Sequence, residues 1–182
     1  DYSGKEGWIE KTPLHVFCTD MIRKYFPDAF VVHVVRDAPS AVASIYDAAQ
    51  KYQNWGQRYL VGAMTIPRIV ALWNRAFLAT QSCTNNANHL IMEFGSLTRC
   101  PEIELDRIID FIGLERPSST AFQLDTSPYV LPSEEWKCDI GNEVKPQRSK
   151  FAKVFSAEEQ TYILENVITG NKKHPVRAFL KT

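Results

Sequence analysis

The stretch "HVVRDAPSAVAS", His33 to Ser44, decides the fold class. It continues an apolar run, "AFVVHVV", which lacks polar alternation, as expected for a parallel strand covered on both faces at the centre of a sheet. Arg36 is the first polar residue after the strand, Asp37 is a suitable N-cap, and Pro39 fits a first helical turn. The stretch therefore predicts a strand that leads directly into a helix.

The same alternation of strand and helix patterns continues on both sides of this stretch. The expected elements are a short strand "GWIE", a helix from Leu14 to Tyr25, a helix with the stripe Val42, Ile45, Tyr46 and Ala49, a helix with Ile69, Leu72, Trp73 and Ala76 inward, a strand "NHLIMEF", a helix from Pro101 to Gly113 and a helix opened by the capping box "SAEE". Alternating strands and helices predict an α/β fold with a mainly parallel sheet flanked by helices.

Composition indicates one globular domain and argues against several classes of partner. The chain has 182 residues, of which 45% are hydrophobic, and 21 basic residues balance 21 acidic ones. This balance gives no overall field for nucleic acid or an anionic membrane surface. No apolar run approaches the roughly 20 residues of a membrane span, and the start shows no signal peptide, so we expect a cytoplasmic location rather than a secretory lumen.

The four cysteines, Cys18, Cys83, Cys100 and Cys138, are widely spread along the chain. They form no CxxC pair and no Cys/His spacing typical of zinc, so we expect no metal site. Cys18 fits an apolar helix stripe, which favours buried free thiols, while two disulfides remain an alternative.

Polar residues follow the strand at the edge where α/β proteins bind ligands. Arg36 presents a guanidinium whose N–H groups match phosphate oxygens, and the next helix points its amino terminus to the same place. Ser40 and Ser44 are four residues apart and share a helix face. The pattern predicts a phosphate site. In the alternative interpretation, Arg36 pairs with Asp37 or a neighbouring acid, and Ser44 only permits close helix packing.

Four segments in order resemble the sulfotransferase superfamily that uses 3′-phosphoadenosine 5′-phosphosulfate (PAPS). They are "EKTPLH" from Glu10, "FPDAFVVHVVRDAPSAVAS" from Phe26, "MEFGSLTRCPEIELDRIIDFIGL" from Met92 and the basic "NEVKPQRSKFAK" ending at Lys153. The resemblance implies a three-layer P-loop-NTPase-like fold and transfer of a sulfuryl group from PAPS to a hydroxyl or amine. It implies PAPS as co-substrate without a metal, and a small-molecule, carbohydrate or peptide acceptor; a homodimer is left open.

The resemblance also assigns residues to the nucleotide. In this family the arginine and serine of the second segment bind the 3′-phosphate, which points to Arg36 and Ser44. A late basic loop closes over the same nucleotide in relatives, which points to Lys145, Arg148 and Lys153.

Two further residues of the first segment are candidates for catalysis. Lys11 matches a lysine that stabilises the transition state in relatives. His15 lies four residues later, and an imidazole is a suitable general base, although a histidine at this position can also simply cap or pack. In several sulfotransferase families the base is instead a glutamate of the upstream region or a histidine at another offset, so this alternative stays open. Glu10 is expected to orient Lys11, and His33 is expected to be a satisfied core histidine. Tyr52, Trp55, Tyr59 and Trp73 are candidates for an acceptor pocket, with Trp73 the more structural of them.

The sequence departs from the family pattern at three places. It has "RDAPS" where relatives read "RDPRD", and Met92 stands where relatives carry a tyrosine. The "PKSGTTW" segment that binds the 5′-phosphosulfate is not found, so we expect residues 1–182 to form one sulfotransferase domain with that part upstream of Asp1. Two alternatives stay open: a P-loop nucleotide or small-molecule kinase that depends on Mg²⁺, and an inactive nucleotide-binding scaffold of the same fold.

Overall fold

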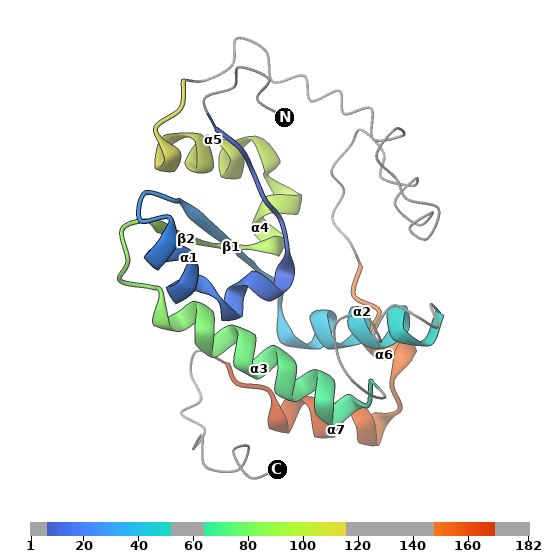
Figure 1. Cartoon of the computed structure of the whole chain (residues 1–182). Coiled ribbons are helices and arrows are strands. Elements are labelled where there is room, and N and C mark those ends of the chain that lie inside the picture. Colours follow the sequence, from blue (N-terminus) through green and yellow to red (C-terminus); the bar gives the residue numbers. More distant parts are fainter. Residues whose placement is uncertain (1–6, 52–63, 116–147, 170–182) are drawn as a thin grey trace.

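The computed structural model describes residues 7–51, 64–115 and 148–169. Figure 1 shows its elements in chain order. They are the 3₁₀ helix η1 (Pro13–Phe17), α1 (Thr19–Tyr25), β1 (Val31–Val35), α2 (Ala38–Lys51), α3 (Ile66–Ser82), β2 (His89–Glu93), α4 (Phe94–Arg99), α5 (Pro101–Ile112), α6 (Phe151–Val154) and α7 (Ala157–Asn166).

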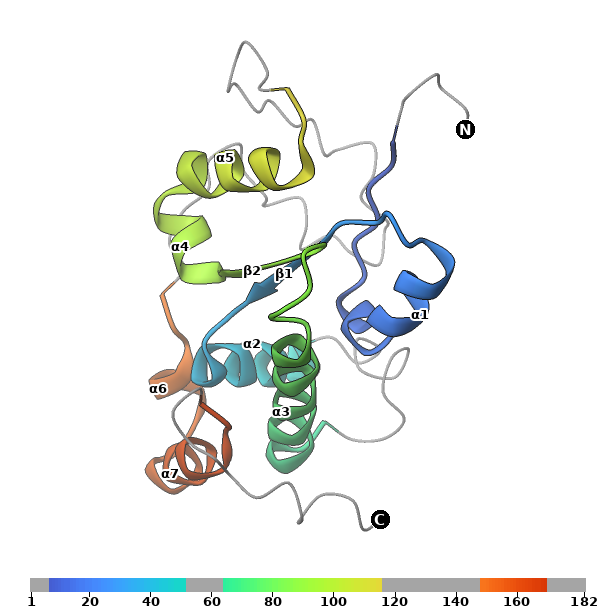
Figure 2. The ribbon, with the colours of Figure 1, turned by 90° about the vertical axis from the view of Figure 1, so that its left-hand side faces the viewer.

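The two strands pair in parallel, as the sequence predicts. Val31 lies opposite His89 and Val35 opposite Glu93, so both strands end at the same edge. α2 and α3 connect the strands on one side, whereas α4 and α5 lie on the other side (Figure 2). The predicted α/β class with helices on both faces of a parallel sheet is therefore confirmed.

The core lies between α2 and α3 and is closed by the C-terminal helices. Val42, Ile69 and Val70 are almost completely buried, and Phe155 and Ile163 cover them from the α6–α7 region. Each fully buried side chain of this size contributes roughly 1.5–3 kcal/mol relative to an exposed one. The core thus fixes α2, and with it the residues at the start of α2.

A buried asparagine ties α3 to the end of α7. The Asn74 Nδ2 donates to the Asn166 carbonyl at 2.9 Å, and its Oδ1 accepts from the Ile168 amide at 2.9 Å. Because both polar atoms of Asn74 are paired with backbone, its burial costs little.

Three predicted helix boundaries are confirmed by their caps. The Asp37 carboxylate accepts from the Ser40 amide at 2.9 Å at the start of α2. Gly113 ends α5 in the left-handed region, at φ 71°. Ser156 and Glu159 form the reciprocal capping box of α7. Each cap satisfies backbone groups that a helix end leaves without partners.

The prediction of a strand at "GWIE" is wrong. Residues 7–12 have no regular secondary structure, and Trp8 and Ile9 are 73% and 96% exposed. Extended residues become a strand only beside a hydrogen-bonding partner, and in the described part of the chain β1 pairs with β2 alone.

The predicted helix from Leu14 to Tyr25 is divided into η1 and α1. Cys18 separates them with a ψ of 13° that belongs to neither helix. Met21 and Tyr25 are 60% and 66% exposed, so the apolar stripe of this segment covers less of the core than its spacing suggests.

The expectation that β1 is a central strand covered on both faces is not met within the described ranges. Val34 is 48% exposed, and the sheet that these ranges form has two strands. β-branched composition reports strand propensity, whereas coverage depends on which other segments pack against the strand.

The cysteines differ in their surroundings. Cys18, Cys83 and Cys100 are free thiols, as expected, but only Cys83 among them is buried; Cys138 lies outside the described residues. None of the helices in the described ranges has the length and apolarity needed to cross a bilayer.

Candidate functional site

Arg36 stands directly after β1, at the carboxyl end of the parallel pair. Its guanidinium carbon lies 5.1 Å from the centroid of the Phe94 ring, which begins α4 after β2. A ring face of this kind holds a guanidinium in place while its N–H edges stay available. Within the described ranges no carboxylate pairs with Arg36, so its predicted alternative, a pair with Asp37, is not formed.

The amino terminus of α2 contributes less to an anion site than its position suggests. The Asp37 side chain takes the Ser40 amide proton, and Pro39 has no amide proton to offer. The helix end is therefore partly occupied by the carboxylate of Asp37. Side chains such as Arg36, rather than backbone amides, are left as the main donors for a phosphate at this corner.

Ser40 links the start of α2 to the C-terminal part of the chain. Its hydroxyl donates to the Ser149 Oγ at 2.9 Å, and Ser149 accepts from the Phe151 amide at the start of α6. Arg148 precedes this contact and is exposed. The described end of the basic loop thus returns to the first turn of α2, a contact between residues 109 positions apart that no local pattern reveals.

An ion-pair cluster holds the same two segments together further along α2. Asp47 accepts from Lys150 at 2.6 Å and from Lys51 at 3.0 Å. These hydrogen bonds lower the pKa of the Asp47 carboxyl below its ordinary value. The spacing of Asp47 and Lys51 is a visible helical signal, but the role of Lys150 in anchoring α6 was missed from the sequence.

The other predicted residues of the site have different surroundings. Ser44 is partly buried on α2, and Lys153 is exposed on α6. Lys145, Tyr52, Trp55 and Tyr59 lie outside the described residues. Trp73 stacks on Phe77 at 4.9 Å and packs against the core, which agrees with its structural interpretation.

The N-terminal candidates form a second group. Glu10 contacts His15, with 3.6 Å between Oε1 and Nδ1, and accepts from the Thr12 hydroxyl at 2.5 Å. Glu10 thus orients His15, whereas it was expected to orient Lys11. Both Glu10 and His15 remain roughly half exposed, at 41% and 45%, and Lys11 is exposed.

The structure does not join these two groups directly. Among the described residues, no hydrogen bond, ion pair or ring contact connects Lys11 or His15 with Arg36, Ser40 or Ser44. The N-terminal group precedes α1, which lies on the opposite side of the strands from α6 (Figure 2). The fold therefore presents a cationic corner at the strand end and a separate carboxylate–imidazole pair.

The histidines of the strands belong to neither group. His33 is buried, and its Nε2 lies 2.8 Å from the Nδ1 of His89, so the prediction of a satisfied core histidine is confirmed. Burial lowers the pKa of both imidazoles below their ordinary value.

Comparison with known proteins identifies relatives of the chain. A model of the sulfotransferase family matches residues 2–118. The crystal structure of mouse sulfotransferase SULT7A1 complexed with PAP is similar in fold, with a TM-score of 0.54 over 80% of the chain at 12% identity. The chain spans 59% of the length of that sulfotransferase. No curated protein sequence shows a significant match.

Proposed function

The chain belongs to the sulfotransferase family, and on this premise we propose that it transfers a sulfuryl group from PAPS to a hydroxyl or amine acceptor and releases PAP. We take residues 1–182 as one sulfotransferase domain. The acceptor is proposed to be a small molecule, a carbohydrate or a peptide, since the described residues favour none of these over the others.

The proposal rests on the position and contacts of Arg36. Its guanidinium lies at the carboxyl end of β1, rests on the Phe94 ring and has no carboxylate partner among the described residues. A charged fork of donors at this edge is suited to the 3′-phosphate of PAPS. Ser44 is partly buried about two helical turns into α2, and its hydroxyl is the proposed second ligand of that phosphate.

The return of the C-terminal segment supports the assignment of the basic residues. Because Ser149 contacts Ser40, the neighbouring Arg148 approaches the end of the sheet that carries Arg36. We assign Arg148, with Lys145 and Lys153, to the nucleotide phosphates. The positive charges compensate the negative charge that the Asp37 cap places at this corner.

His15 is the proposed general base. A carboxylate beside Nδ1 favours the tautomer with the proton on that nitrogen, which leaves the Nε2 lone pair free to accept the acceptor's O–H or N–H proton. As this proton moves to Nε2, the acceptor atom forms a bond to sulfur, and the bond from sulfur to the bridging oxygen breaks. PAP leaves with that electron pair, and Lys11 stabilises the charge that develops on the bridging oxygen.

The test is binding of PAP to the full chain, followed by thermal unfolding. PAP is expected to raise the Tm of the wild-type chain, and Arg36→Ala is expected to abolish this rise because the phosphate loses its charged partner. Arg99→Ala is the matched control, since Arg99 is an exposed arginine on α4 whose guanidinium donates to the Ser96 Oγ of the same helix. This control should keep the full rise.

Two outcomes would contradict the proposal in different ways. A rise in Tm with ATP and Mg²⁺ but none with PAP would favour the kinase alternative. A rise with PAP that is not followed by transfer from PAPS to phenol, sugar or amine acceptors would favour the inactive scaffold.

A further inference from the structure

Three metal-ligating side chains from distant parts of the chain meet beneath the sheet. One ring nitrogen of His33, one ring nitrogen of His89 and the Cys83 Sγ all lie within 4.8 Å of one another. His33 and Cys83 are buried and His89 is partly buried. We refer to these three residues as the histidine–cysteine cluster. It takes no part in the proposed sulfuryl transfer.

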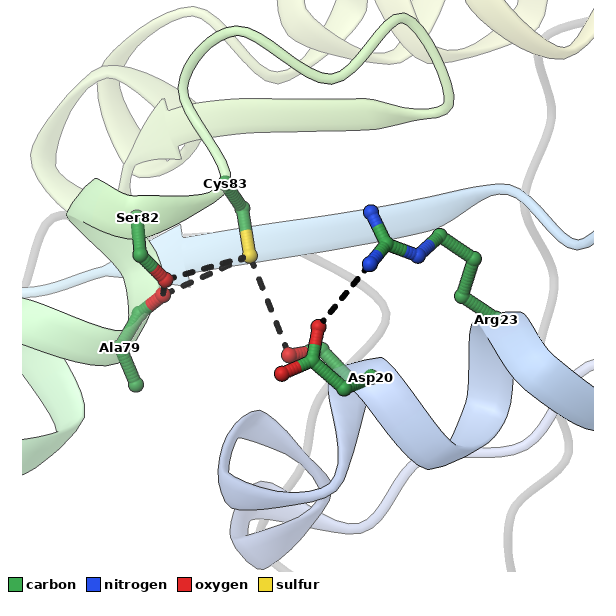
Figure 3. Close-up of polar contacts among 6 residues, drawn as sticks. Asp20, Arg23, Ala79, Ser82 and Cys83 are labelled. Carbon is green, nitrogen blue, oxygen red and sulfur yellow. Dashed lines mark hydrogen bonds and ion pairs between the residues drawn. The ribbon is translucent and has the colours of Figure 1, made fainter.

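Strand register and the end of α3 create this cluster. Because Val31 pairs with His89, the side chains of His33 and His89 lie diagonally on the same face of the parallel strands. Cys83 caps the C-terminus of α3, the helix that covers this face, and its backbone amide donates a hydrogen bond to the Thr80 carbonyl. Figure 3 shows its sulfur between the end of α3 and Asp20 of α1.

The protonation states suit metal ligation. The two facing nitrogens are hydrogen-bonded at 2.8 Å, so one of them carries a proton, and each ring has a second nitrogen that can hold a proton instead. For both facing nitrogens to bind a metal, His33 must carry its proton on Nδ1, where the Thr80 hydroxyl lies at 3.5 Å. The hydroxyl can accept this proton, so the tautomer that metal binding requires keeps a partner for Nδ1.

The surroundings of the cluster leave a route for an ion. Cys83 and His89 also line a pocket of about 400 Å³ together with Asp20 and Arg23. Asp20 pairs with Arg23, one turn later on α1, at 3.3 Å on one wall of this pocket. The sulfur itself has only weak partners, among them the Ala79 carbonyl at 3.4 Å and the Thr19 hydroxyl at 3.9 Å. A thiol held this loosely can turn towards a metal at small cost.

We propose that the histidine–cysteine cluster binds one divalent ion of the zinc class, with His33 Nε2, His89 Nδ1 and Cys83 Sγ as ligands and a water in the fourth position facing the pocket. Two imidazoles with one thiolate are a donor set that Zn²⁺ prefers over Mg²⁺ or Ca²⁺. Binding replaces the proton of the Cys83 thiol by the metal, so one proton is released from that thiol per ion bound.

The ligand atoms must move by up to roughly 1.2 Å to hold such an ion, because they lie within 4.8 Å of one another. Zn–N bonds of about 2.0–2.1 Å and a Zn–S bond of about 2.3 Å at tetrahedral angles place ligand atoms roughly 3.3–3.6 Å apart. The two imidazole nitrogens are 2.8 Å apart, so they must separate by roughly 0.5 Å when the ion replaces their hydrogen bond. The ion would then join β1, β2 and the end of α3.

The test is titration of the untagged full chain, freed of metal with a chelator, with Co²⁺ and then with Zn²⁺. One Co²⁺ per chain is expected to produce the near-ultraviolet charge-transfer band of a cobalt–thiolate bond, and Zn²⁺ is expected to displace it. Cys83→Ser should abolish the band. Cys100→Ser is the matched control, because Cys100 is a free but exposed thiol, and it should keep the band.

A second variant keeps the test informative if Cys83→Ser fails to fold. His89→Gln is expected to weaken Co²⁺ binding by more than the roughly 10–100-fold that loss of a partner orienting a ligand costs. Absence of the band in the wild-type chain would overturn the proposal. A band that survives Cys83→Ser, or that depends on the nearby exposed Cys18 instead, would overturn it as well.

The metal site and the proposed function can fail independently. Arg36→Ala should leave Co²⁺ binding unchanged, and Cys83→Ser should leave the rise in Tm with PAP unchanged. A variant that lost both would show that the two measurements report folding rather than separate sites.

Discussion

The carboxyl end of the β1–β2 pair carries a charged side chain, whereas the interior face of the same two strands carries neutral ones. At the carboxyl end, Arg36 presents a permanent charge that rests on Phe94 and has no acidic partner in the described ranges. On the interior face, His33 and His89 are kept neutral by burial and hydrogen-bond to each other. Two strands of five residues thus carry both the proposed phosphate site and the proposed metal site.

The difference shows that access to solvent decides whether a basic side chain is charged, and therefore which kind of ligand it can bind. A guanidinium keeps its charge because it stays hydrated at the strand end, so it can attract a phosphate from solution. A buried imidazole loses its proton because desolvation disfavours the charged form, and the neutral ring is the form that binds a metal. We therefore expect substitutions at the strand end to leave metal binding unchanged, and substitutions in the histidine–cysteine cluster to leave PAP binding unchanged.

The largest effect is expected from a residue that belongs to neither place. His15→Ala should lower turnover by roughly 10²–10⁴-fold, because the acceptor proton loses its base. The rise in Tm with PAP should stay, since no contact among the described residues joins His15 to Arg36, Ser40 or Ser44. Turnover assays with labelled PAPS, paired with PAP melts, measure both. Loss of PAP binding in this variant would show that the two groups form one continuous site.

Glu10→Gln is expected to have a smaller effect on turnover than His15→Ala. It removes the carboxylate that favours one tautomer of His15 but leaves the imidazole in place. A smaller loss of turnover with an altered pH profile is the expected result. An unchanged pH profile would argue against His15 as the base.

The next largest effect is expected at the strand end. Arg36→Lys should weaken PAP by roughly 10–100-fold, because an ammonium keeps the charge but loses the bidentate fork. Isothermal titration calorimetry with PAP measures this affinity, and Arg99→Lys is the control. If the Arg36 and Arg99 variants bind PAP with equal affinity, Arg36 does not bind the phosphate. The strand end would then carry no anion site to set against the interior face.

A third prediction separates the helix cap from the phosphate site. Asp37→Ala should lower the free energy of unfolding by about 0.5–2 kcal/mol, because the Ser40 amide loses its acceptor. PAP affinity should be unchanged or higher, since the variant frees an amide proton and removes a negative charge. Ser156→Ala, which removes the α7 cap, is the control: it should cost similar stability without improving PAP affinity. Weaker PAP binding in Asp37→Ala would mean that the carboxylate orients the site.

The smallest effect is expected from pH, acting on the interior face. The pKa values of His33 and His89 are lowered from an ordinary value of 6.5, so the unfolded chain binds more protons than the folded chain in mildly acidic solution. Stability is therefore complete above pH 6.5 and falls as pH decreases towards the lower folded pKa values.

Urea unfolding of the metal-free chain at several pH values measures this dependence. His89→Gln should reduce the slope, because one of the two imidazoles with a lowered pKa is removed. A slope of opposite sign would show that the imidazoles are charged in the folded chain, which would also weaken the metal proposal.

Much of the fold was predictable because its signals are local. The strand before Arg36, the Asp37 cap, the left-handed Gly113 and the capping box at Ser156 depend on residues within a few positions of one another. Propensity and capping act over this range, so a sequence pattern is enough to find them. The placement of Arg36 at the sheet edge follows from the same rules.

Other features required contacts that no spacing reveals. The extended residues around Ile9 were mistaken for a strand because composition does not say whether a partner strand lies alongside. Cys18 was expected to be buried, yet it is exposed where η1 and α1 meet. The link from Ser40 to Ser149 also joins segments far apart in the chain.

By itself, the sequence determined the alternation of strands and helices and the presence of an arginine at the end of β1. Only the tertiary structure decided that Arg36 rests on Phe94 and that His33, Cys83 and His89 meet. The physical reason is that capping and propensity act between neighbours in the chain, whereas pairing register and burial depend on which distant segments the core brings together.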